Sequence, residues 1–181
     1  MSPRAESSGE TVSARLAAAF RRNGVEIAFG QSIPTPFYLA GAPAGIRQIA
    51  YRQENSGGAM ADAYARISNR VGVVTAQNGP AATLLVAPLG EALKASIPIV
   101  ALVQDVPRNL GEKNAFQDFD HIRMFDACAK WVRRLEHADR VDDYVDRAFA
   151  AAASGRPGPS VLLVPYDVFA ESVAPSTKRR A

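Results

Sequence analysis

The chain has 181 residues, of which 48% are hydrophobic and 22% are charged, and its formal net charge is +3. This composition is typical of a globular protein, and the length suits one domain with its own core. No apolar run approaches the stretch of about 20 residues that spans a bilayer, and no basic stripe alternates with aromatic residues, so we expect neither a membrane nor a nucleic-acid partner.

The N-terminal residues and the cysteine content indicate the expected cellular compartment. The first residues, MSPRAESSGE, lack the apolar core of a signal peptide, so we expect no export. The single cysteine, Cys128, has no partner for an internal disulfide, which fits a reducing cytoplasm. We expect Cys128 to be a small, partly buried apolar side chain rather than a reactive thiol.

Helical and extended patterns alternate along the chain. In chain order, the first half predicts a helix at 11–23, a strand at 25–29, a loop at 31–36 leading into a short helix to 39, a strand at 46–51, a small-residue helix at 55–67 and a strand at 71–76. The second half predicts one helix at 81–95, a strand at 97–103, a long loop from 104 to about 118, a weaker strand at 130–135, a helix at 139–153 and a strand at 160–165.

Strands separated by helices of this length predict βαβ units. The expected fold class is therefore α/β, with a three-layer, doubly wound and mostly parallel sheet of about six strands and helices on both faces. We expect residues 10–173 to form the domain, residues 1–9 to be a disordered tail, and residues 174–181 to be a linker or tail.

Ligands of open parallel sheets bind outside the carboxyl ends of the strands. Four loops leave such ends: Gly30-Gln31-Ser32, Arg52-Gln53-Glu54, Gln77-Asn78-Gly79-Pro80, and the long loop after Val103. Glu54 is the one carboxylate that the pattern places directly at a strand end and at once before a helix. It is the first candidate for chemistry.

Several familiar signatures are missing. No G-x-G-x-x-G follows the first strand, and neither G-x-x-x-x-G-K-[ST] nor G-x-S-x-G occurs. No metal site is predicted, because His121 and His137 lack nearby cysteine partners and are expected to be surface or hydrogen-bonded residues.

The segment Arg52-Gln53-Glu54, followed by A-M-A-D-A-Y-A-R up to Arg66, resembles a known signature. It is similar to that of the thiamine-diphosphate-dependent enzymes related to acetolactate synthase and 2-keto acid decarboxylases, with the same spacing from Glu54 to Asp62. Further pieces occur in the same order as in that family: Asn78-Gly79-Pro80, Ser96-Ile97-Pro98, Val106-Pro107, Ala115-Phe116-Gln117, Gly155-Arg156-Pro157-Gly158-Pro159 and Pro165-Tyr166-Asp167-Val168. The resemblance covers residues 10–173.

In that family this segment is the N-terminal, pyrimidine-binding domain. The resemblance implies that Glu54 is catalytic: it hydrogen-bonds N1′ of the aminopyrimidine and so favours the tautomer that removes the thiazolium C2 proton. It also implies cofactor contacts from Asn78, Gly79 and Pro80. Without the resemblance, the preferred interpretation of Glu54 is an exposed residue stabilised by a helix dipole, and Asn78 is equally interpreted as a turn residue.

The resemblance also suggests residues on the substrate side or at an interface: Gln31, Ser32, Gln53, Phe116 and Gln117. In the family, the loop with Phe116 and Gln117 reaches the active site across a dimer interface, whereas from the residues alone it is a surface loop. Gln53 stands where the family has His, and Gln31-Ser32 replaces a P-G turn. These departures leave the 2-keto acid and the reaction, decarboxylation or carboligation, open.

The family's other domain carries a G-D-G…N motif for Mg²⁺ and the diphosphate, and nothing like it occurs here. The resemblance therefore implies that thiamine diphosphate is held here by its pyrimidine end only. Mg²⁺ would come through a diphosphate-binding domain on a separate chain or in a missing C-terminal part, in a homodimer or hetero-oligomer that takes a small 2-keto acid. The alternative is a non-catalytic binding or scaffold domain of the same fold.

Overall fold

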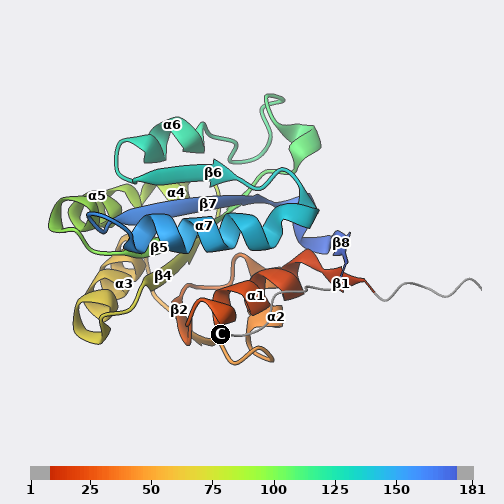
Figure 1. The fold of residues 1–181 in the computed structure, drawn as a ribbon. Coiled ribbons are helices and arrows are strands. Elements are labelled where there is room, and N and C mark those ends of the chain that lie inside the picture. Colours follow the sequence, from red (N-terminus) through yellow and green to blue (C-terminus); the bar gives the residue numbers. More distant parts are fainter. Residues whose placement is uncertain (1–8, 175–181) are drawn as a thin grey trace, which may run out of the picture.

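The computed structural model describes residues 9–174, so the predicted tails at 1–9 and 174–181 lie outside this part except for Gly9 and Ala174. Six parallel strands form one sheet in the order β3-β2-β4-β5-β7-β6. Their bounds are Ile27–Phe29 (β2), Arg47–Ile49 (β3), Gly72–Ala76 (β4), Ile99–Asp105 (β5), Trp131–Arg134 (β6) and Pro159–Pro165 (β7). A separate antiparallel pair joins β1 (Glu10–Thr11) to β8 (Ser172–Val173), near the two ends of the described chain (Figure 1).

Helices cover both faces of the sheet (Figure 1). One face packs against α1 (Val12–Arg22), α2 (Thr35–Gly41) and α7 (Val141–Ala153). The other face packs against α3 (Glu54–Ser68), α4 (Pro80–Thr83), α5 (Val86–Ala95) and α6 (His121–Asp126). Three 3₁₀ turns complete the described elements: η1 (Arg108–Leu110), η2 (Ala138–Arg140) and η3 (Tyr166–Ala170). The predicted three-layer α/β fold with about six strands is confirmed.

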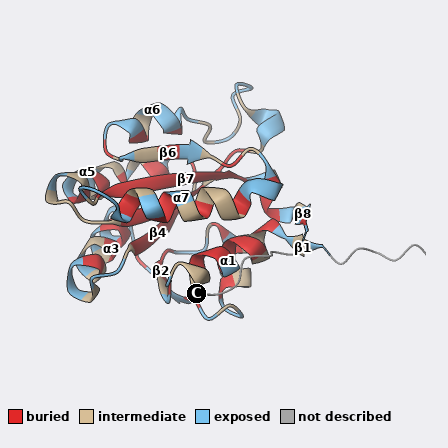
Figure 2. Ribbon diagram, viewed as in Figure 1, coloured by how far each residue is buried: buried red, intermediate tan, exposed pale blue. Residues whose placement is uncertain are grey.

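The core follows from alternation along the central strands. In β5, Val100 and Leu102 pack toward α1 and α7, whereas Ile99, Ala101 and Val103 pack toward α5 and α6, because successive side chains of a strand point to opposite faces. The central strands β4, β5 and β7 are buried almost throughout (Figure 2). Strands covered on both faces read as continuous apolar runs, which is why the sequence located them well.

The single helix predicted at 81–95 is wrong, since the structure has α4 and α5 with a break at Leu84 and Leu85. Pro88 explains the break. It lacks the N–H that would bond to the Leu84 carbonyl, and its ring crowds that carbonyl. At the break, the Leu85 amide donates instead to Ala82, three residues back, at 3.1 Å.

Two further differences concern the region after β5. The strand extends to Asp105 rather than Val103, so the long loop (residues 106–120) begins later and contains η1. The helix α6 follows it and was not predicted, because six residues are too few to show a helical period. Asp120 caps this helix, and its side chain accepts a hydrogen bond from the Arg123 amide at 3.1 Å.

Candidate functional site

The carboxyl ends of β2, β3, β4 and β5 lie along one edge of the sheet, because all four strands run parallel. From β2 the chain turns to α2 on one face, and from β4 it turns to α4 on the other. Loops that diverge in this way open a crevice between neighbouring strands, which is where open α/β sheets bind ligands.

Glu54 lies at this edge as the first residue of α3, after the extended N-cap residue Gln53. Its half-buried side chain lines a small pocket of about 60 Å³. The other lining residues come from the ends of all three neighbouring strands: Gln31, Ser32, Ile33, Tyr51 and Gln77. The expectation that Glu54 follows a strand directly is wrong, because β3 ends at Ile49 and four residues separate it from α3. Glu54 nevertheless lies with the strand ends, because it lines one pocket together with Tyr51 and Gln77.

A hydrogen-bond chain below Glu54 holds the strand ends together. The Tyr51 hydroxyl donates to the Thr75 carbonyl at 2.5 Å. The Thr75 hydroxyl donates to the Ile33 carbonyl at 3.1 Å and, having used its proton, accepts from the Tyr38 hydroxyl at 2.7 Å. Burial raises the pKa of Tyr51, and the nearby charge of Glu54 raises it further. The Tyr51 hydroxyl therefore stays protonated and remains a donor.

Glycines bring α3 close to these residues. A Cβ at Gly57 would lie 2.2 Å from the Tyr51 ring, and a Cβ at Gly58 would lie 2.4 Å from Pro88 of α5. Both glycines are therefore required for packing within this chain. Ala59, in contrast, is exposed.

A second group of predicted residues lies on the neighbouring loop after β4. Asn78 is 5% exposed, and its side-chain amide donates to the carbonyls of Phe116 at 3.3 Å and Gln117 at 2.9 Å. Gly79 has φ +66, and a Cβ there would lie 2.6 Å from the Cβ of Gln117. Pro80 is exposed and begins α4. The structure thus brings Asn78 and Gly79 together with the Phe116–Gln117 segment of the long loop.

The side chains of the long loop differ in their surroundings. Phe116 is 80% exposed, without the core packing that its size allows. Gln117 has φ +59, and its Oε1 is buried without a hydrogen-bond partner among the described residues.

Gln53, at the start of α3, is also exposed, and its side chain makes no capping hydrogen bond. Gln53 and Phe116 are therefore free to contact something outside the described chain.

The sequence interpretation missed a buried polar group at the same edge. Asp105 is the last residue of β5, so the carboxylate that directly ends a strand at this edge is Asp105 and not Glu54. Asp105 is 6% exposed, accepts from Arg134 Nε at 2.6 Å, and lies 3.2 Å from Nδ1 of His121, which is 2% exposed. Burial alone would raise the pKa of Asp105, but its contacts with His121 and Arg134 outweigh burial and hold that pKa below its usual range.

This group borders a cavity of about 490 Å³ between the long loop, β6 and the start of α6. In the sequence, the only signal for this buried polar group is the position of Asp105 at the end of an apolar run. His121 and Arg134 reach Asp105 from separate elements, so no local spacing marks them. Within residues 9–174, no group of three or more His, Cys, Asp or Glu side chains could hold a metal ion.

No helix in the part that the structure describes is long and apolar enough to cross a membrane.

Comparison with known proteins relates this fold and site to one family. The family model described as thiamine pyrophosphate enzyme, N-terminal TPP binding domain, matches residues 10–124. The acetolactate synthase large subunit of Parasynechococcus marenigrum (strain WH8102) is 37% identical over 163 residues, which are 86% of this chain and 26% of the relative.

Two further relatives have similar identity and coverage. Acetolactate synthase isozyme 2 large subunit of Escherichia coli (strain K12) is 34% identical over 152 residues, 83% of this chain and 28% of the relative. Acetolactate synthase 2, chloroplastic, of Zea mays is 35% identical over 165 residues, 89% of this chain and 26% of the relative. The chain thus spans about a quarter of the length of these relatives. It belongs to the thiamine pyrophosphate enzymes as an N-terminal TPP-binding domain, similar to that of the acetolactate synthases.

Proposed function

We propose that this chain is the pyrimidine-binding half of a thiamine-diphosphate-dependent enzyme that acts on a 2-keto acid by decarboxylation or carboligation. The family supports the cofactor, and the named activity of its relatives, acetolactate synthase, supports the substrate class. The observation that carries the proposal is the place of Glu54, a half-buried carboxylate at the switch point of the sheet, in a pocket formed by the ends of three strands.

The residues of this pocket fit one edge of a flat, nitrogen-containing ring. A water molecule takes up about 30 Å³ of liquid, so a pocket of about 60 Å³ receives the edge of a ring but not the whole cofactor. The carboxylate of Glu54 offers a hydrogen-bond partner for a ring nitrogen. Gln31 and Ser32 lie exposed at the rim, where they can contact the substrate or a second protein surface.

When bound, thiamine diphosphate supplies the electron-sink chemistry that reactions of 2-keto acids need. Glu54 would hold a proton at N1′ of the aminopyrimidine, acting as a general acid and base toward that atom. The hydrogen-bonded Tyr51 below it would keep the start of α3 fixed relative to β4, so that the carboxylate meets the ring in one orientation. Asn78, Gly79 and Pro80 would form the neighbouring wall.

The diphosphate and its Mg²⁺ need another domain. We propose that a diphosphate-binding domain, on a separate chain or further along the same polypeptide, covers the site and supplies the metal ligands. The exposed side of α3, with Ala59, Ala63 and the 84% exposed Ile67, offers a surface for that domain or for a second copy in a homodimer or hetero-oligomer. We place the assembly in the cytoplasm, on the argument from Cys128.

The alternative is a non-catalytic binding or scaffold domain. In that case Glu54 merely stabilises the start of α3 through the helix dipole. The two functions differ in what Glu54→Gln does to an assembled enzyme.

The test combines the chain with a diphosphate-binding partner domain, thiamine diphosphate and Mg²⁺, and follows consumption of pyruvate. Glu54→Gln keeps the size and a hydrogen-bond donor but cannot exchange the proton, so we expect a loss of kcat of about 100-fold or more. Glu91→Gln, a change at a 73% exposed glutamate of α5, is the control and should leave kcat unchanged. Equal rates for wild type and Glu54→Gln in an active complex would exclude the catalytic role.

A further inference from the structure

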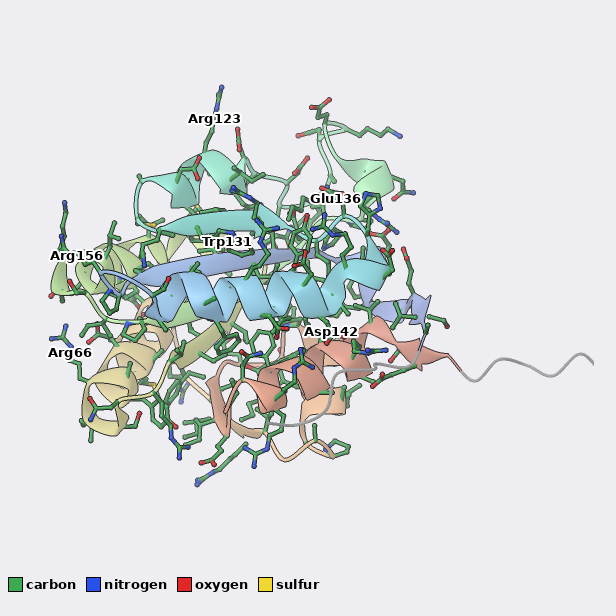
Figure 3. All side chains as sticks on the ribbon, in the orientation of Figure 1. Arg66, Arg123, Trp131, Glu136, Asp142 and Arg156 are labelled. Carbon is green, nitrogen blue, oxygen red and sulfur yellow. The ribbon has the colours of Figure 1, made fainter. Side chains whose placement is uncertain are left out.

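His121 begins α6 and is turned into the protein, at 2% exposure. Two residues later, Arg123 extends away from the body of the protein (Figure 3). The His121 Nε2 atom accepts a hydrogen bond from the backbone amide of Gly79 at 2.8 Å. A backbone N–H can only donate, so Nε2 carries no proton, and the ring proton of the neutral imidazole lies on Nδ1.

The other side of the ring explains why this tautomer is preferred. Nδ1 lies 3.2 Å from Oδ1 of Asp105. The two atoms are close but not aligned as a hydrogen bond, so the contact is electrostatic. A negative carboxylate beside Nδ1 favours the form in which that nitrogen carries the N–H.

Asp105 is itself held in place on both oxygens. Its Oδ1 accepts from the Val106 amide at 2.9 Å, and its Oδ2 accepts from Arg134 Nε at 2.6 Å. Arg134 also donates to the Val106 carbonyl at 3.0 Å. The carboxylate is therefore ionised and cannot turn away from the imidazole.

The Gly79 amide is buried, and a buried backbone N–H without an acceptor costs free energy. His121 Nε2 is the acceptor for this amide. Its backbone angles, φ +66 and ψ −130, lie outside the helical and strand regions. A hydrogen bond at this amide holds the unusual turn from which α4 begins. His121 thus connects the ends of β4 and β5 through the loop that is proposed to contact the cofactor.

We propose that His121 is a positioning residue: Asp105 and Arg134 hold it in the Nδ1–H tautomer, and its Nε2 fixes the Gly79 amide and with it the Asn78–Pro80 wall of the cofactor site. The tautomer and the hydrogen bond stand on the geometry alone. The consequence for the cofactor rests on the proposed function.

The first experiment needs no substitution. Nitrogen NMR of the imidazole in the 181-residue chain should show Nε2 unprotonated, with a scalar coupling across the hydrogen bond to the Gly79 amide nitrogen. A protonated Nε2, or two tautomers in exchange, would overturn the proposal.

The second experiment tests the orienting role of Asp105. In Asp105→Asn the side chain loses its negative charge, and its NH₂ group meets a donor in either orientation, the Val106 amide or Arg134 Nε. The electrostatic preference for the Nδ1–H tautomer is therefore lost, Nε2 carries the proton in part of the molecules, and the coupling to Gly79 decreases. An undiminished Gly79 coupling in Asp105→Asn would show that Asp105 does not orient the ring.

The third experiment separates positioning from packing. His121→Gln carries a carbonyl oxygen at about the reach of Nε2 and should keep slow hydrogen exchange at the Gly79 amide. His121→Phe keeps the ring volume but has no acceptor, and exchange at Gly79 should speed up at least about tenfold. If Gly79 exchanges equally slowly in both variants, His121 only fills space.

In the enzyme assembled with its diphosphate-binding domain, His121→Phe should weaken thiamine diphosphate binding by about tenfold in titration calorimetry, and His121→Gln should restore most of it. Equal affinity in wild type and His121→Phe would overturn the link to the cofactor site. If the wild-type assembly binds no cofactor at all, the proposed function fails, while the NMR results on His121 and Gly79 stand by themselves.

Discussion

The side-chain amide of Asn78 donates to the backbone carbonyl of Gln117 at 2.9 Å, across 39 positions of sequence. This bond joins the loop that leaves β4 to the long loop that follows β5. Asn78 is buried, and its second acceptor is the Phe116 carbonyl at 3.3 Å. The Phe116 ring is therefore exposed, while the backbone carbonyls of Phe116 and Gln117 are held by hydrogen bonds from Asn78.

Asn78→Ala should release this anchor. We expect a loss of about 1–2 kcal/mol in the free energy of unfolding, because two partly buried hydrogen bonds to backbone carbonyls lose their donor. Hydrogen exchange at Phe116 and Gln117 should accelerate. Asn78→Asp is the matched variant, since it keeps the shape and replaces the donor by an acceptor, and it should be at least as destabilising. Unchanged exchange in Asn78→Ala would show that the long loop is held elsewhere.

Gly79→Ala should lower the free energy of unfolding by more than the addition of a single methyl group suggests. The new Cβ would lie 2.6 Å from the Cβ of Gln117, at a residue with φ +66. Gly24→Ala is the control, because Gly24 has φ +83 but no atom within 4 Å of the added Cβ. In the control, the free energy of unfolding measured in urea should fall only by the cost of a Cβ at positive φ, about 1–2 kcal/mol. Equal losses in the two variants would mean that the contact with Gln117 relaxes without cost.

Tyr51→Phe removes the hydroxyl that bonds to the Thr75 carbonyl and leaves the ring against Gly57. We expect a loss of about 1 kcal/mol in the free energy of unfolding. The assembled enzyme should also show a lower kcat, since the start of α3 is less firmly held. Tyr166→Phe, at a tyrosine that is 54% exposed, should stay within about 0.5 kcal/mol of wild type. A Tyr51→Phe protein as stable as Tyr166→Phe would contradict this role.

Acid should weaken the protein partly through Asp105. Its pKa in the folded protein lies below the ordinary value of 3.8, so the folded state binds the proton less tightly than the unfolded state. The contribution of this carboxylate to stability is complete above about pH 5 and is lost as the pH falls through the folded-state pKa.

Unfolding by urea at several pH values measures this contribution. The difference in stability between wild type and Asp105→Asn should be largest near neutral pH and should shrink below about pH 4. Asp126→Asn, which removes one exposed charge from α6, is the control. A difference for Asp105→Asn that does not change with pH would show that the carboxylate acts through its shape alone.

The sequence predicted the strands of the sheet more completely than the residues that meet at the candidate site. All six predicted parallel strands occur, and runs such as 71–76 and 97–103 were the clearest, because they are apolar and β-branched, as is typical of strands covered on both faces. The helix boundary at Leu84 depended on a proline further along the chain, and α6 was too short to show a period. The segment containing Glu54 stood out through its motif, whereas His121 carried no local signal.

The sequence by itself determined the α/β class, the order of its elements and the family, since these depend on hydrophobic periodicity and on motifs that lie within short segments. The tertiary structure alone decided what meets at the sheet edge. It placed Glu54 in a pocket shared by three strand ends, joined Asn78 to Gln117 by a hydrogen bond, and set Asp105, itself bound by Arg134, beside His121, whose Nε2 accepts from the Gly79 amide. Such contacts join residues far apart in the chain, and their geometry follows from how the layers pack rather than from local spacing.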